Sequence, residues 1–157
     1  MFGLFWTPVN RSQDIGDARI AASQRILLVV LATGLISLLV VAAWLPPDPR
    51  GYGTHQQLGL PPCSFQQLTG WRCPSCGMTT SWSHLVRGQI AASFRANSGG
   101  ALLGLVCLVV APWALMCGLR GRWLFKPPGP SVAMALALTV TGVTLADWLI
   151  RCLIVGS

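Results

Sequence analysis

Residues 26–45 form a predominantly apolar stretch that carries no charged side chain. As an α-helix, about 20 residues rise roughly 30 Å, which is the thickness of the hydrocarbon core of a bilayer. Two more apolar stretches follow at 99–119 and 131–151, and the last contains one acid, Asp147. Pro112 lies inside the second stretch, where neighbouring helices can satisfy the carbonyl that it leaves free. The three stretches predict three transmembrane helices.

The composition excludes the soluble alternatives. Hydrophobic residues make up 53% of the chain and charged residues only 10%, whereas an average soluble domain is about 25% charged. The remaining polar sequence is too short to cover three buried helices of a soluble core, and a disordered chain, a coiled coil or a collagen-like fibre has a different composition. We therefore predict an all-α fold, a small integral membrane protein with three transmembrane helices plus one amphipathic interfacial or re-entrant helix.

The distribution of basic residues predicts the orientation of this protein. An N-terminal tail over 1–25 precedes the first apolar stretch. This stretch is longer than the apolar run of 7–15 residues in a typical signal peptide and is interpreted as an uncleaved anchor. With three spans, the tail and the basic loop 120–130 lie on one side of the membrane. Their basic residues lie close to the spans: Arg11, Arg19, Arg25, Arg120, Arg122 and Lys126. The positive-inside rule then places the N-terminus in the cytoplasm of a bacterial inner membrane, with 46–98 outside.

The net charge of +7 has a sufficient explanation in topology and in contact with anionic lipid. The arginines are not interleaved with aromatic residues on a soluble face, as a nucleic-acid interface would require. We therefore expect the lipid bilayer and other membrane protein subunits as partners, and no nucleic acid.

The segment between the first two spans divides into two parts. Residues 46–76 are rich in proline and glycine and show no helix or strand pattern over most of their length. From residue 77 to residue 97, apolar residues recur at steps of three and four, with polar residues between them. This pattern predicts an amphipathic helix that lies in the interface or re-enters the bundle, or one that merely connects and covers the spans.

The six cysteines fall into two groups. Cys107, Cys117 and Cys152 lie within or near the predicted spans, where a single cysteine is most often a small packing residue. The other three, Cys63, Cys73 and Cys76, lie in polar, turn-rich sequence. This second group is the candidate site.

Three kinds of chemistry suit a C-P-S-C sequence followed by glycine. The two thiolates can bind a metal at a tight turn, or they can form a redox-active dithiol, because a following helix lowers the pKa of a cysteine at its N-terminus. A plain disulfide is the third: Cys63 can pair with Cys73 or Cys76 in an oxidising compartment. A thioredoxin-like enzyme would place the motif in a βαβ fold, and that pattern is missing from this sequence.

A zinc site normally has four ligands, and the cluster offers three thiolates. His55 lies in flexible sequence eight residues before Cys63 and is the candidate fourth ligand. His84 is a poorer candidate, because on a helix it would lie about 12 Å beyond Cys76 along the axis. Zinc is thus a candidate cofactor, and metal, disulfide and free thiols remain open.

The order and spacing of the motifs resemble a known family. The run CSFQQLTGWRCPSCGMTTSW at 63–82 and RGQIAASFRAN at 87–97 are similar to the bacterial membrane-protein family called domain of unknown function 2752. The family pattern falls on Cys63, Gly70, Cys73, Pro74, Cys76, Gly77, Thr79, Gly88 and Asn97. Thr80 stands where many members have arginine, and Gln89 where an acid is commoner. The resemblance implies a small helical membrane protein and no known activity.

Two further observations complete the prediction. Asp147 and Arg151 lie four residues apart and can form an ion pair on one face of the third span, either within the membrane or at its interface. No set of catalytic residues is evident, because Asp48 is the only acid between the first two spans and a Ser–His pair needs an orienting acid. We expect a non-enzymatic accessory or scaffold subunit of a larger membrane complex with a structural cysteine site. The alternatives are a zinc-binding membrane protein and a membrane thiol–disulfide exchanger that uses Cys73 and Cys76.

Overall fold

The computed structural model describes residues 19–155, and over this range the protein is all-helical with no named strand. Of the N-terminal tail, residues 1–18, with Arg11, lie outside the described part. The element order is α1 (Ala22–Trp44), the 3-10 helix η1 (Thr54–Leu58), α2 (Ser64–Thr69), α3 (Met78–Leu85), α4 (Ile90–Ala96), α5 (Ser98–Arg120) and α6 (Pro130–Val155). The three helices α1, α5 and α6 are long and apolar enough to cross a membrane, which confirms the predicted fold class.

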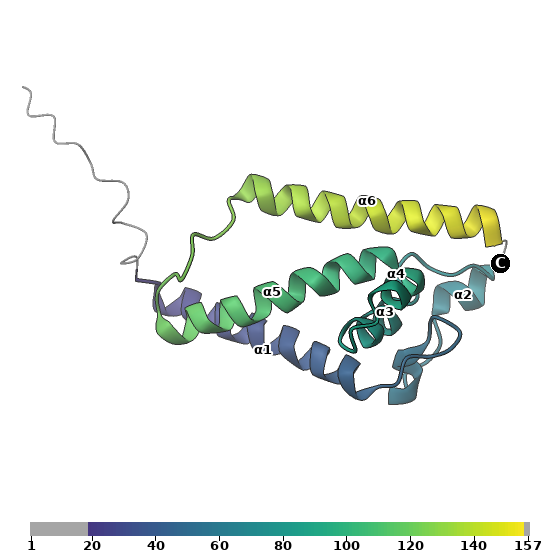
Figure 1. Ribbon diagram of the computed structural model, residues 1–157, viewed down its shortest axis with the longest axis horizontal. Coiled ribbons are helices and arrows are strands. Elements are labelled where there is room, and N and C mark those ends of the chain that lie inside the picture. Colours follow the sequence, from purple (N-terminus) through teal and green to yellow (C-terminus); the bar gives the residue numbers. More distant parts are fainter. Residues whose placement is uncertain (1–18, 156–157) are drawn as a thin grey trace, which may run out of the picture.

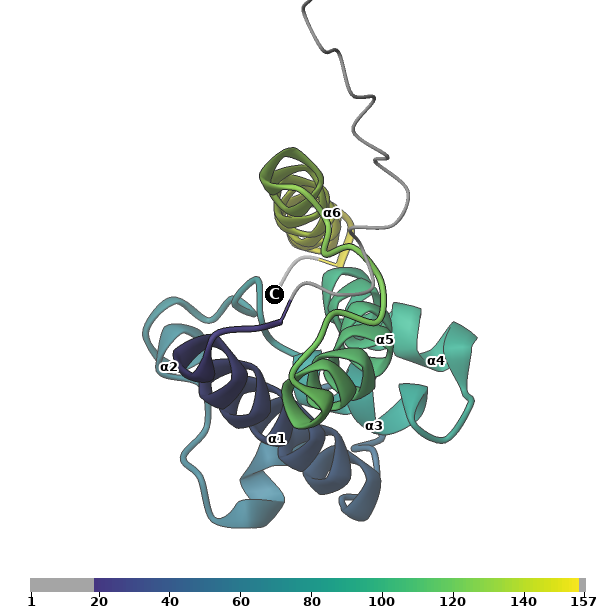
Figure 2. The same cartoon turned by 90° about the vertical axis from the view of Figure 1, so that its left-hand side faces the viewer.

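Small residues allow α1 and α5 to pack closely (Figure 2). Ala32 on α1 and Ala111 on α5 are completely buried, and a Cβ atom added at Gly118 would lie 2.7 Å from Cγ2 of Val29. In a bilayer, close packing of this kind replaces the hydrophobic effect as the main attraction between helices. The large apolar side chains point outward instead, as the 60% exposure of Val40 illustrates, and fit contact with lipid.

The third long helix, α6, is attached to the rest of the described chain near its C-terminal end (Figure 1). The carboxylate of Asp147 lies 2.6 Å from Nη2 of Arg151 and also accepts the backbone N–H of Ser98. Arg151 donates to the carbonyl of Ala96 at 2.7 Å, and the indole of Trp148 donates to the carbonyl of Arg72 at 2.6 Å. The ion pair therefore joins α6 to the start of α5, and Trp148 joins α6 to the cysteine-bearing loop.

The sequence predicts one amphipathic helix over 77–97, whereas the structure has two short helices, α3 and α4. The break occurs because Gly88 has a positive φ of 74°, a conformation that cannot continue a right-handed helix. Within 46–76, where the sequence predicts only turns, the structure also forms η1 and α2, each closed by a glycine of positive φ.

Three of the four buried residues of α3 are polar, although the sequence pattern was apolar. Thr80, Ser81 and Ser83 are completely buried beside the apolar Leu85, while Ile90, an apolar position of the pattern that lies on α4, is 46% exposed. The Thr80 hydroxyl lies 2.8 Å from that of Thr54, and the Ser81 hydroxyl lies 2.9 Å from that of Ser93. These hydroxyl pairs satisfy one another, so α3 packs closely against its neighbours at little polar cost. In this way α3 is held against η1, α4 and α5.

Candidate functional site

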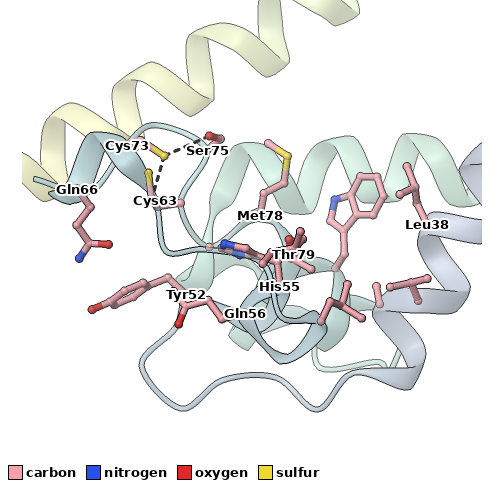
Figure 3. Close-up of a pocket in the computed structure, with 18 residues that line it drawn as sticks. Leu38, Tyr52, His55, Gln56, Cys63, Gln66, Cys73, Ser75, Met78 and Thr79 are labelled. Atoms are coloured by element: carbon pink, nitrogen blue, oxygen red, sulfur yellow. Dashed lines mark hydrogen bonds between the residues drawn. The ribbon is translucent and has the colours of Figure 1, made fainter. Parts of the chain in front are cut away.

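The fold gathers Cys63, Cys73 and Cys76 into one cluster. Figure 3 shows Cys63 and Cys73 next to each other at one end of the adjoining cavity. Their Sγ atoms all lie within 4.8 Å of one another, and those of Cys73 and Cys76 are 3.0 Å apart. All three thiols are free and partly exposed. Within residues 19–155, they are the one group of three or more histidine, cysteine or acidic side chains close enough together to share a metal ion.

Local turns position each of the three cysteines. Cys63 is the residue that precedes α2, and Gly70 ends this six-residue helix with a φ of 76° and turns the chain back toward Cys73. The Cys76 N–H donates to the carbonyl of Cys73 at 3.0 Å, which closes the tight turn between the two thiols. Gly77 follows with a φ of 90° and starts α3. A helix, a tight turn and two left-handed glycines thus bring three thiols that are ten and three residues apart to one point.

Asn97 holds this turn against α5. Its side chain is almost fully buried, and Nδ2 donates to the carbonyls of Pro74 and Cys76 at 3.0 and 3.1 Å. Its Oδ1 accepts the N–H of Gly100 at 2.6 Å and so caps the N-terminus of α5. The sequence assigned Asn97 only to a family pattern, without a role. An asparagine directly before an apolar stretch is a helix-capping signal, which accounts for the contact with Gly100 but not for those with Pro74 and Cys76.

The electrostatic environment differs between two of the thiols. The backbone amide of Gln66 lowers the pKa of the Cys63 thiol, and hydrogen bonding with Cys73 and Cys76 lowers it further. Burial raises the pKa of Cys76 to about 12, and the hydrogen bond with Cys73 adds to the rise. A bound cation reverses such an effect, because a thiol that coordinates a metal loses its proton.

His55, the candidate fourth ligand, is not part of the cluster. It lies on η1 and lines the same cavity as the three cysteines, but its ring is set apart from their sulfur atoms (Figure 3). His84 is engaged elsewhere, since its Nδ1 lies 2.6 Å from Oε1 of Gln89. Within the described chain, the protein therefore brings three of the four predicted ligands together.

A cavity of about 560 Å³ adjoins the cysteine cluster. One wall comes from the last turns of α1, and another from the segment that contains η1. Tyr52 also lines the cavity, and the Arg72 guanidinium lies 4.1 Å from the centre of its ring. No sequence pattern indicated this cavity, because it forms between segments that are far apart along the chain.

The family described as Protein of unknown function (DUF2752) matches residues 63–111. The matched segment contains the three cysteines, the tight turn, α3, α4, Asn97 and the first half of α5. This match confirms the family resemblance for the part of the chain that builds the site. No curated protein and no solved structure matches the chain.

Proposed function

We propose that this chain is a non-enzymatic membrane protein whose Cys63, Cys73 and Cys76 thiolates bind one zinc ion, and that it acts as an accessory subunit of a larger membrane complex. The observation that carries the metal proposal is the mutual approach of three Sγ atoms to within 4.8 Å. A disulfide would use two of these thiols and leave the third unpaired. A metal ion uses all three.

The dimensions of the cluster also suit zinc. Zinc–sulfur bonds of about 2.3 Å in a tetrahedron place the sulfur atoms roughly 3.8 Å apart. In the cluster, the Sγ atoms of Cys73 and Cys76 are 3.0 Å apart, and no two of the three Sγ atoms are more than 4.8 Å apart. Shifts of about 1 Å or less in these distances therefore produce the arrangement that zinc requires. Thiolates favour soft or borderline metals such as zinc over magnesium or calcium. A dithiol exchanger is less well supported, because Cys107 and Cys117 are buried singly on α5 and offer no second pair for electron relay.

The metal content of the native protein tests this proposal. After purification in a mild detergent without chelator, we expect about one zinc per chain and a complex larger than one chain. Cys76→Ser should lose the metal, whereas Cys152→Ser, a matched change on α6, should retain it. Metal-free native protein, or equal zinc in both variants, would contradict the metal site. An isolated monomer would contradict the accessory role.

We also propose that the cysteine cluster lies outside the cytoplasm of a bacterial cell, in the inner membrane. The support comes from the opposite end of the bundle, where the N–H of Ile20 donates to the carbonyl of Gly121 and Nε of Arg25 donates to the carbonyl of Gly118. These contacts bring the basic segments before α1 and after α5 together, as the positive-inside rule expects for a cytoplasmic face.

A fusion experiment tests the orientation. Alkaline phosphatase, which is active only outside the cytoplasm, should be active when fused to the C-terminus and inactive when fused after Lys126 with α6 removed. The opposite pattern would show that the cluster faces the cytoplasm.

A further inference from the structure

We infer that the metal site keeps its fourth coordination position open to the adjoining cavity, and that the cavity binds a single-chain lipid whose anionic carboxylate reaches the metal. This inference rests on the proposed zinc site and names the ligand that completes it.

The ligand count leaves one position open. Three protein ligands plus one exchangeable ligand is the arrangement of zinc sites that bind external molecules, whereas purely structural sites are closed by four. His55 lines the cavity but lies outside the group of three thiols. The space between the cluster and His55 therefore belongs to the cavity.

The cavity connects the cluster with a membrane-spanning helix. Leu38, Val41 and Ala42 of α1 form one part of its wall, and the three cysteines form another. The polar residues Gln66 and Ser75 also line the cavity, and both lie close to the cysteines in the sequence. The volume of about 560 Å³ falls within the range of 300–1,000 Å³ that is usual for small-molecule sites. An amphiphile from the bilayer suits this lining, with its chain along α1 and its head group at the cysteines.

A positive charge beside the cavity offsets the negative charge of the metal cluster. Three thiolates and one zinc ion carry a net charge of about −1, and Arg72 is adjacent to Cys73 in the chain. The Arg72 guanidinium stacks on the ring of Tyr52. The Arg50 guanidinium lies 5.3 Å from the centre of the same ring and forms an ion pair with the Asp48 carboxylate. Within the described residues, Arg72 makes no ion pair. Its positive charge therefore offsets the net negative charge of the zinc–thiolate cluster, and the open position of the metal accepts a carboxylate oxygen as a ligand.

Cobalt-substituted protein in phosphatidylcholine nanodiscs provides the test, with laurate as the probe. Cobalt in a thiolate site absorbs visible light, and a new fourth ligand shifts the bands. We expect laurate to shift them, and Val41→Trp, which fills the apolar part of the cavity, to raise the half-saturating laurate content at least tenfold. Val40→Trp, on the exposed neighbouring position outside the cavity, should behave as the native protein.

The outcomes separate this inference from the proposed function. Protein without cobalt bands at any laurate content would contradict the metal site itself. Cobalt bands that laurate leaves unchanged would overturn the lipid inference and leave the metal site intact. An equal laurate response in both tryptophan variants would also overturn it, because the head group would then reach the metal without using the cavity. Laurate partitions equally into all three samples, so the comparison between variants is decisive.

Discussion

Gly77→Ala is expected to abolish metal binding, although residue 77 has no side chain of its own. A Cβ atom at this position would lie 2.5 Å from the carbonyl oxygen of Ala96 and 2.8 Å from that of Gly51. Both are backbone atoms and cannot rotate away. The backbone of Gly77 also has a φ of 90°, which costs an alanine about 1–2 kcal/mol.

The clash adds to the backbone strain. Overpacking in a rigid region costs about 1–3 kcal/mol, so the total loss of folding free energy should be about 2–5 kcal/mol. The close contacts are relieved at the lowest energy by a shift of the turn that carries Cys76, and this shift would separate the three sulfur atoms. Zinc content and the midpoint of thermal unfolding in detergent measure the two effects.

Gly70→Ala is the matched control for this change. Gly70 lies in the same loop and has a φ of 76°, but nothing lies within 4 Å of its added Cβ atom. The substitution should therefore cost only the backbone strain, about 1–2 kcal/mol, and zinc should remain bound. If Gly77→Ala retains zinc as well as Gly70→Ala does, the close contacts at Gly77 do not hold the cluster.

The membrane helices were predictable because their signal is local. A long run without charge leaves few alternatives to a transmembrane helix, and α1 and α5 follow the predicted stretches closely. The cysteine spacing likewise predicted a candidate site, since residues 73 and 76 can approach each other across a turn. The spacing did not settle whether Cys63 joins them, because ten residues of loop permit many conformations.

The remaining features depend on contacts between distant segments. The burial of Thr80 follows from its hydrogen bond with Thr54, 26 residues earlier, and an apolar periodicity gives no sign of it. The place of His55 in the cavity wall is set by η1, which the proline-rich sequence did not indicate. The pairing of Asp147 with Arg151 was readable from their spacing, whereas the contact of Arg151 with the carbonyl of Ala96 required the fold.

Asn97 combines a local and a distant contact, and Asn97→Asp separates them. Aspartate has the same shape and keeps the oxygen that caps α5 through the N–H of Gly100. It replaces the two N–H donors to the carbonyls of Pro74 and Cys76 with an oxygen that repels them. Leaving buried acceptors unsatisfied costs about 1–3 kcal/mol, so the turn should move and zinc affinity should fall at least tenfold.

Two further variants show which property of Asn97 matters. Asn97→Ser loses the two donors without adding a charge, and it should also bind zinc more weakly, because serine remains a good helix cap but is too short to replace both contacts. Ser98→Ala is the neighbouring control, since the Ser98 hydroxyl donates only to the carbonyl of Phe94. It should bind zinc as the native protein does. Weak binding in Asn97→Asp together with native binding in Asn97→Ser would mean that charge repulsion, and not the loss of the two hydrogen bonds, displaces the thiols.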